Sequence, residues 1–198
     1  MIAIIDYGMG NLSSVKNALS HLGLDCKITS DKNDIISADK VILPGVGAFK
    51  DAIETIRAKK FDETIYDCVK DKKPLLGICL GFQLLFDKSY EFGDFDGLGL
   101  LKGEIKKLEI PLKVPHVGWN SLEKTFDPKL LKDINNGQYV YFVHSYYLEP
   151  KEDFVSSYTE YGVKIAATVE KDNIFGAQFH PEKSGDVGLK ILKNFGDL

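Results

Sequence analysis

The stretch PLLGICLGFQ, residues 74–83, decides the fold. Its first half is a continuous apolar run typical of a buried β-strand, and its second half begins a helical pattern. Gly77 and Gly81 each lie two residues from Cys79, which is the Gly-x-nucleophile-x-Gly spacing of a strand-to-helix elbow with sulfur in place of oxygen. Glycines there let backbone approach closely, so the cysteine can adopt a strained conformation and point its thiol at solvent. A helix N-terminus beside the sulfur favours the thiolate.

The first half of the chain alternates short β-branched runs with amphipathic helical patterns. This alternation favours an α/β fold with an open, mostly parallel (flavodoxin-like) sheet and helices on both faces. The predicted strands cover residues 2–5, 25–28, 40–43 and 74–79, and the predicted helices carry Val15, Ala18, Leu19 and Leu22 before Gly23, and Ala52, Ile53 and Ile56.

From about Gly103 to Gln178 the pattern changes to successive strands with turns such as Asn136-Gly137, which predicts an antiparallel extension of the sheet. The predicted strands are residues 103–108, 138–143, 163–170 and 174–178. Residues 92–99 are predicted to be loop, and a last helix carrying Leu192 and Phe195 to pack on the sheet. With no linker or repeat, residues 1–198 are predicted to form a single domain.

Composition excludes several classes of protein. The 25 basic and 29 acidic residues give a net charge of −4, and the lysines are scattered among acids, so we expect no nucleic acid partner. Asp6 interrupts the first apolar run and none approaches the ~18 residues of a membrane helix, so we expect neither export nor membrane insertion. Three cysteines without a CxxC pair favour free thiols in the cytoplasm. No cluster has metal-ligand spacing and Ser13 breaks a dinucleotide-binding glycine pattern, so no metal or cofactor is expected.

A thiol nucleophile needs a base, and His180-Pro181-Glu182 is the candidate. Proline restricts the residue before it and fixes its own φ, so we expect this segment to be extended, with residues i and i+2 on one face. Glu182 would then hold one ring nitrogen of His180 while the other faces Cys79. The remaining histidines and cysteines lack such neighbours and are interpreted as structural: His21, His116, His144, Cys26 and Cys68.

The segments 77–83 and 178–184 together resemble the class I glutamine amidotransferases. Four further blocks are similar to those of the glutaminase subunits of imidazole glycerol phosphate synthase: residues 6–12, 44–49, 115–120 and 141–146. The resemblance runs from about Ile2 to Phe195. One departure is Phe82, where many relatives carry Met or His, and it leaves the three catalytic positions intact.

This resemblance implies a mechanism and its residues. Cys79 would attack the side-chain amide of glutamine, His180 would pass the thiol proton to the departing ammonia, and Glu182 would orient His180. The oxyanion would be stabilised by the Leu80 amide and by the loop of Gly45, Val46 and Gly47, where a peptide flip could switch hydrolysis on. Residues at the positions that hold glutamine in the family are Gln83, Ser145 and Tyr146.

The resemblance also implies a partner. Ammonia would go to a separate cyclase subunit that makes imidazole glycerol phosphate and AICAR in histidine biosynthesis, because a (β/α)8 barrel of ~250 residues exceeds the whole chain. The two subunits would form a heterodimer. Residues placed toward that interface by the resemblance are Asn11, Trp119, Tyr141 and Lys183.

Two other functions remain open on the residues. A glutaminase subunit of another synthase, such as anthranilate synthase, would share fold and catalytic residues, although Val46-Gly47 and residues 116–120 weigh against it. A stress or chaperone-like protein would share a flavodoxin-like sheet and an elbow cysteine, but the His180-Pro181-Glu182 segment argues against it. A catalytically dead interaction module is disfavoured because all three catalytic residue types are present.

Overall fold

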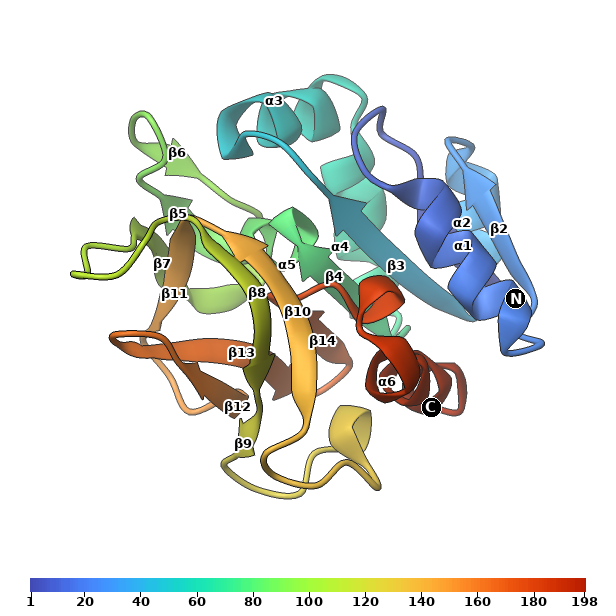
Figure 1. Cartoon of the computed structure of the whole chain (residues 1–198). Coiled ribbons are helices and arrows are strands. Elements are labelled where there is room, and N and C mark those ends of the chain that lie inside the picture. The colour runs from blue at the N-terminus through green and yellow to red at the C-terminus, as the bar shows by residue number, and fades with distance from the viewer.

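An eight-stranded sheet organises the chain, which the computed structural model describes over residues 1–198 (Figure 1). Its strands, in spatial order, are β2 (Cys26–Thr29), β1 (Ile2–Ile5), β3 (Lys40–Gly45), β4 (Leu75–Cys79), β14 (Ile174–Ala177), β13 (Lys164–Lys171), β12 (Val155–Glu160) and β9 (Glu123–Lys124). The pairs from β2 to β14 are parallel and those from β14 to β9 are antiparallel. The predicted parallel sheet with an antiparallel extension is confirmed.

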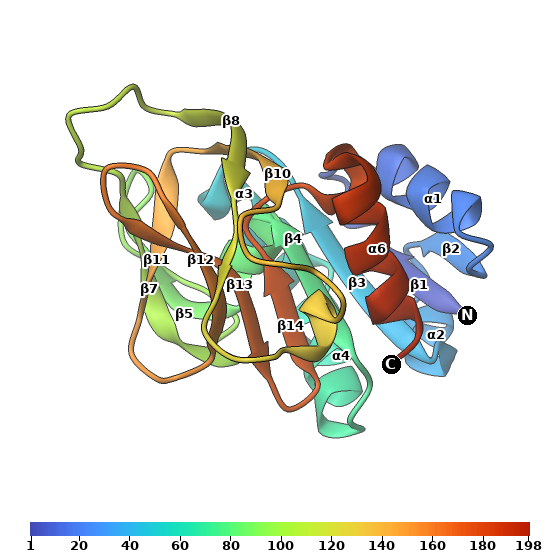
Figure 2. The same ribbon diagram turned by 60° about the horizontal axis from the view of Figure 1, so that its bottom comes forward.

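Helices cover both faces of the parallel part. Helices α1 (Leu12–His21) and α6 (Gly185–Gly196) lie side by side on one face, where Leu19 and Phe195 pack with the strand residues Ile4 and Ile42 (Figures 1 and 2). On the other face lie α2 (Lys32–Ser37), α3 (Phe49–Ala58) and α4 (Phe61–Lys70). Both faces of the strands are therefore apolar, which explains the continuous hydrophobic runs at 2–5 and 74–79.

Two smaller sheets complete the molecule. A four-stranded sheet extends the core on the α3 side, in the order β11 (Tyr146–Pro150), β7 (Leu101–Lys107), β5 (Phe86–Ser89) and β6 (Phe95–Asp96). A two-stranded ribbon of β8 (His116–Ser121) and β10 (Tyr139–His144) covers the α6 side, where Val140 and Phe142 are buried. The short elements α5 (Leu80–Leu84), η1 (Lys129–Leu131) and η2 (Pro181–Lys183) connect these layers.

Several elements differ from the predictions. Residues 92–99 are not all loop, because Phe95–Asp96 pair with β5 as strand β6. Strands β5, β8, β9, β11 and β12 and helix α2 had no predicted counterpart. Gly118 interrupts the pattern of β8 and Pro150 ends β11, while α2 is only six residues long. Such short or interrupted segments carry little periodic signal of their own.

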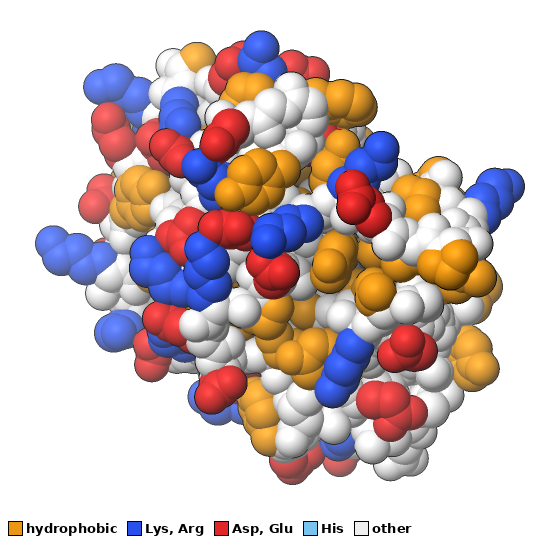
Figure 3. All heavy atoms as spheres, turned by 90° about the vertical axis from the view of Figure 1, so that its left-hand side faces the viewer, with side chains coloured by type: hydrophobic (Ala, Val, Ile, Leu, Met, Phe, Trp, Pro, Cys, Tyr) orange, Lys and Arg blue, Asp and Glu red, His pale blue; other side chains and the backbone are white.

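The surface over the four-stranded sheet carries mixed charges. Lysine and acidic side chains alternate there without a large patch of one sign (Figure 3). Glu104 pairs with both Lys106 and Lys151, and Asp87 pairs with Lys102 at 2.8 Å. Among the helices, none combines the length and apolar character required to cross a membrane.

Candidate active site

Cys79 occupies a strained elbow between β4 and α5. Its φ and ψ are 56° and −108°, a conformation that is uncommon for a residue with a side chain. A Cβ on Gly81 would lie 1.8 Å from the carbonyl oxygen of Leu43 in β3, and one on Gly77 would lie 2.7 Å from that of Gly81. Glycine is therefore required on both sides of the cysteine, and the predicted elbow is confirmed. The thiol does not point at open solvent, because Cys79 is only 9% exposed.

His180 and Glu182 form a buried pair next to the elbow. Nδ1 of His180 lies 2.8 Å from Oε1 of Glu182, and the two side chains are 5% and 1% exposed. The predicted contact is present, but the predicted extended conformation is wrong beyond His180. Pro181 begins the 3₁₀ turn η2, since its fixed φ suits the first position of a helical turn. The turn brings the carboxylate back toward the ring.

The charges around His180 favour its protonated form. Burial, the largest influence, lowers the pKa of His180, but hydrogen bonds and charge from Cys79 and Glu182 raise it to about 9. The effect of Cys79 on this pKa requires the sulfur and the ring to be close neighbours. Cys79, His180 and Glu182 can therefore work as one unit, with an imidazolium available to give a proton to a leaving group.

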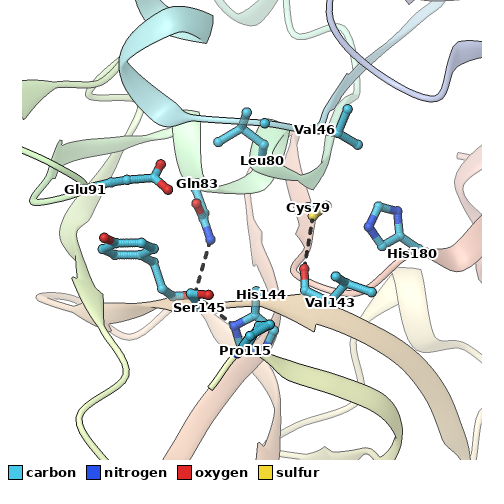
Figure 4. A pocket seen from close by; sticks show the side chains of 12 residues that line it. Val46, Cys79, Leu80, Gln83, Glu91, Pro115, Val143, His144, Ser145 and His180 are labelled. Carbon is cyan, nitrogen blue, oxygen red and sulfur yellow. Dashed lines mark hydrogen bonds between the residues drawn. The ribbon is translucent and has the colours of Figure 1, made fainter. Parts of the chain in front are cut away.

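A cavity of about 290 Å³ opens over Cys79 and His180 (Figure 4). All the predicted oxyanion and substrate residues except Gly45 line it. Its full lining is Val46, Gly47, Cys79, Leu80, Gln83, Glu91, Pro115, Val143, His144, Ser145, Tyr146 and His180. Gly45 lies instead behind the cavity, beside a smaller void that also borders Asn11 and Glu182. The carbonyl oxygen of Val143 lies 3.9 Å from the Cys79 sulfur.

Gln83 fixes one wall of the cavity. Its side-chain amide nitrogen donates to the carbonyl oxygen of Tyr146 at 3.2 Å (Figure 4). The same nitrogen donates to Oε1 of Gln178 at 3.0 Å. Both Gln83 protons are thus used within the protein, and its oxygen is left to receive a donor. Gln83 therefore connects α5, which follows the nucleophile, to the start of β11.

Four lining residues were not predicted as site residues: Glu91, Pro115, Val143 and His144. Two of them, Glu91 and His144, have ionisable side chains. Glu91, at the end of β5, accepts a hydrogen bond from the Phe49 amide at 2.6 Å, and burial raises its pKa. Figure 4 shows its carboxylate pointing into the cavity at the end away from Cys79 and His180. His144, interpreted above as structural, also lines the cavity and approaches the Tyr146 carbonyl oxygen with Nδ1 at 2.8 Å. No local motif distinguishes Glu91 in the sequence, whereas His144 lies in the block 141–146 that carries the resemblance.

The residues predicted for a partner interface divide into two places. Trp119 and Tyr141 are cross-strand neighbours on the β8–β10 ribbon with ring centroids 6.0 Å apart, and Lys183 is exposed on η2. Asn11 lies before α1, beside the void that borders Glu182. No group of three or more His, Cys, Asp or Glu side chains is placed to share a metal ion.

This fold and this site define the class of protein. The family model for glutamine amidotransferase class-I matches residues 3–197, so the chain belongs to the class I glutamine amidotransferase family. Solved structures agree in fold: a glutamine amidotransferase has a TM-score of 0.77 at 18% identity, with 98% of each chain covered. PurLQS from Thermotoga maritima has a TM-score of 0.76 at 22% identity, covering 98% of this chain and 96% of that chain.

Closer similarity is found among curated proteins named imidazole glycerol phosphate synthase subunit HisH. The protein from Caldanaerobacter subterraneus subsp. tengcongensis is 56% identical over 199 residues, covering 100% of this chain and 98% of the relative. The one from Bacillus cereus (strain AH187) is 53% identical over 195 residues, covering 98% and 93%. Within class I, the chain groups with these HisH subunits.

Proposed function

We propose that the chain is the glutaminase subunit of an imidazole glycerol phosphate synthase, hydrolysing glutamine to glutamate and ammonia for histidine biosynthesis. The observation that carries this proposal is the grouping of Cys79 and His180 at one end of the 290 Å³ cavity, with Glu182 hydrogen-bonded to His180. The full-length similarity to HisH subunits favours this synthase over anthranilate synthase, and the buried His180–Glu182 pair disfavours a non-enzymatic stress protein.

The three residues act in successive steps of the reaction. The Cys79 sulfur attacks the side-chain amide carbon of glutamine, and the resulting tetrahedral intermediate collapses to a thioester as His180 protonates the departing ammonia. His180 then takes a proton from water, which attacks the thioester and releases glutamate and the free thiol. Glu182 holds Nδ1 of His180 throughout, which keeps Nε2 directed at the sulfur.

Backbone amides stabilise the oxyanion. Leu80 follows the nucleophile at the start of α5 and lines the cavity, so its amide is the first donor. Val46 and Gly47 also line the cavity, and a peptide of the Gly45–Gly47 loop would supply the second donor. A donor of this kind contributes roughly 2.7–4 kcal/mol to the transition state. Gly47 has a φ of +99°, which is consistent with a loop whose peptide planes turn easily.

Polar groups at the other end of the cavity would hold the amino-acid part of glutamine. The Glu91 carboxylate is the acidic group there and suits the α-ammonium of the substrate. Ser145 and Tyr146 also line the cavity, where backbone and hydroxyl groups are available to the α-carboxylate. The substrate would therefore span the cavity with its side-chain amide at Cys79.

Ammonia released at Cys79 would pass to a cyclase subunit with a (β/α)8 barrel. The support is the exposed outer face of the β8–β10 ribbon, which carries Val117, Trp119, Tyr139, Tyr141 and Val143. Aromatic side chains grouped on a surface are typical of protein interfaces. Lys183 borders this face, because a Cβ on Gly185, two residues later, would lie 4.0 Å from the Trp119 ring. The heterodimer would close over the ribbon and η2.

Further parts of the proposal concern the chain as a whole. Residues 1–198 would act as one glutaminase domain, since both hydrophobic clusters pack on one central sheet. The free thiols of Cys26, Cys68 and Cys79 suit the reducing cytoplasm. Neither a metal nor a cofactor has a role in the proposed steps.

The test is glutamate release from glutamine by the purified chain, alone and with an imidazole glycerol phosphate cyclase and its nucleotide substrate. Strong stimulation by the cyclase and its substrate is the expected result. Stimulation by another synthase subunit instead would keep the chemistry and overturn the partner. Absence of glutamate with every partner would reject the glutaminase.

A further inference from the structure

The inner face of the β8–β10 ribbon carries two histidines that the mechanism does not use. His116 and His144 are paired in the register of the ribbon, and the two residues are 3% and 6% exposed. Nδ1 of His116 lies 3.0 Å from Nε2 of His144. The His116 ring is stacked between Phe142 at 4.9 Å and Tyr161 at 4.0 Å, which fixes its plane.

Hydrogen-bond partners at both ends of this pair decide where the protons are. The Tyr146 carbonyl oxygen only accepts, so Nδ1 of His144 carries a proton toward it at 2.8 Å. At the other end, the Asn120 side-chain nitrogen donates to Nε2 of His116 at 3.4 Å. The orientation of that amide is itself fixed, because Asn120 also donates to the Glu160 carbonyl and accepts from the Ser121 amide.

Only one arrangement of neutral rings satisfies every contact. His144 donates from Nδ1 and accepts at Nε2, and His116 donates from Nδ1 and accepts at Nε2. The chain of hydrogen bonds therefore runs in one direction from Asn120 through His116 and His144 to Tyr146. Burial lowers the pKa of each ring to about 4, which is consistent with both being neutral near pH 7.

The two ends of this chain of hydrogen bonds have different neighbours. Tyr146 lines the cavity with Ser145, and its carbonyl oxygen receives both His144 and Gln83. Asn120 follows the exposed Trp119 in β8. A partner bound to the ribbon would thus act on the Asn120 end of the chain of hydrogen bonds, while the proposed glutamine-binding residues lie at the Tyr146 end.

We propose that His144 and His116 are positioning residues that hold Ser145 and Tyr146 for glutamine through this one-way chain of hydrogen bonds. Asn120 forms the other end of the chain, next to Trp119 of the exposed face of the β8–β10 ribbon. The inference rests on the proposed function for its substrate, but the direction of the protons follows from the contacts alone. Under this proposal, a change in the geometry of the β8–β10 ribbon reaches the substrate site through the two histidine rings.

The first experiment measures the protons directly, by ¹⁵N NMR of the full chain labelled at histidine. We expect two of the four rings to be neutral with the proton on Nδ1 at pH 7, and to stay neutral down to pH 5. His144→Asn and His116→Phe assign the signals. If His116 or His144 is charged at pH 6, or carries its proton on Nε2, the proposal is overturned whatever the chain catalyses.

The second experiment measures the KM for glutamine in the complex with the cyclase. His144→Leu removes the donor to Tyr146 and should raise KM about tenfold, the effect of one hydrogen bond, with kcat changed less than about twofold. His144→Asn keeps an N–H near the Nδ1 position and should recover most of the affinity. Calorimetric titration with the cyclase should give the unmodified affinity for both variants, which shows that each folds and docks. If Asn binds glutamine no better than Leu, His144 does not act through its donor.

A third pair of variants tests the direction of the hydrogen bonds. Asn120→Asp places an acceptor against Nε2 of His116 and forces the donors to reverse or a ring to become charged, whereas Asn120→Ala only removes the end group. We expect Asp to raise the KM for glutamine more than Ala does, although Asp is the closer replacement in shape. The opposite order contradicts the proposal. Loss of glutamate release by the unmodified complex would instead reject the glutaminase, leaving the NMR result to judge the chain of hydrogen bonds.

Discussion

The carbonyl oxygen of Val143 lies 3.9 Å from the sulfur of Cys79, while the Val143 side chain stands on the exposed face of the β8–β10 ribbon. A single residue therefore belongs both to the wall of the reaction cavity and to the proposed docking surface. A partner on the ribbon would lie one residue away from the nucleophile, so a short route for ammonia needs no long channel within this chain.

Replacing the nucleophile should separate the two activities of the complex. Cys79→Ala removes the attacking sulfur, so we expect glutamine-dependent synthesis to fall by about 10⁴-fold or more while ammonia-dependent synthesis remains. Cys68→Ala is the control, because Cys68 is buried in α4 away from the cavity and should leave both activities in place. Retained glutaminase activity in Cys79→Ala would show that the elbow is not the site of attack.

Removing the Trp119 side chain from the β8–β10 ribbon should weaken binding of the cyclase without affecting the fold. Trp119 is 54% exposed at the centre of the apolar face, and Trp119→Ala should weaken cyclase binding by about 2 kcal/mol, roughly thirtyfold in Kd. Calorimetric titration of one subunit with the other measures this change. Ile36→Ala is the matched control, since Ile36 is 43% exposed on α2, away from the ribbon. Equal affinities for the two variants would place the interface elsewhere.

The pKa of His180 should depend on the sulfur. Cys79 is the first of the groups that raise this pKa to about 9, so Cys79→Ala should lower it, as an NMR titration of the ring signals will show. A raised pKa stabilises the fold most at pH values below the unfolded value of about 6.5, and that stability is lost as the pH rises through 9. Urea unfolding should therefore show the free energy of unfolding falling between pH 6.5 and 9, on the order of 3 kcal/mol, with a shallower fall in Cys79→Ala. Identical slopes would argue against the coupling.

Glycine at position 81 should be essential to the fold. In Gly81→Ala the new methyl group would collide with the β3 backbone at Leu43, which should lower the free energy of unfolding by about 3–5 kcal/mol. Gly23→Ala provides the comparison, because Gly23 has a φ of +70° but open space around it and should cost only about 1–2 kcal/mol. Chemical denaturation measures both. A loss in Gly81→Ala no larger than that in Gly23→Ala would mean that the β3 backbone moves aside for the methyl group at little cost.

Tyr7→Phe should stabilise the protein. The Tyr7 hydroxyl is fully buried beside Gly45 and has no hydrogen-bond partner, so its removal should raise the free energy of unfolding by about 1 kcal/mol. Tyr66→Phe should have the opposite sign, since the Tyr66 hydroxyl donates to the Leu98 carbonyl at 2.8 Å. Urea unfolding of both variants tests the pair. A loss of stability in Tyr7→Phe would reveal a partner for that hydroxyl.

The parts of the site that the sequence predicted are those coded by neighbouring residues. The elbow depends on glycines two residues from Cys79, and the parallel sheet depends on alternating local patterns. His180 and Glu182 were also predicted as a pair, although the 3₁₀ turn that joins them was not, because proline fits both an extended segment and a helical first turn.

Features that need distant segments to meet escaped prediction. Glu91 reaches the cavity only because β5 belongs to a second sheet that packs beside α3 and α5. The contact between His116 and His144 depends on the register of two strands separated by a long connection, and Gly118 hides the first of those strands. His116 and His144 lie in blocks that resemble the glutaminase subunits, but a local block does not show that the two rings meet, and Glu91 lies in no such block.

The exposed row of Val117, Trp119, Tyr139 and Val143 has a consequence for the cell as well as for catalysis. Apolar side chains standing together on a two-stranded ribbon favour self-association when nothing covers them. A cell that made this chain in excess of its partner would accumulate subunits prone to aggregate and to be degraded. Matched synthesis of the two polypeptides would then be favoured by solubility alone, before any advantage in ammonia use is counted.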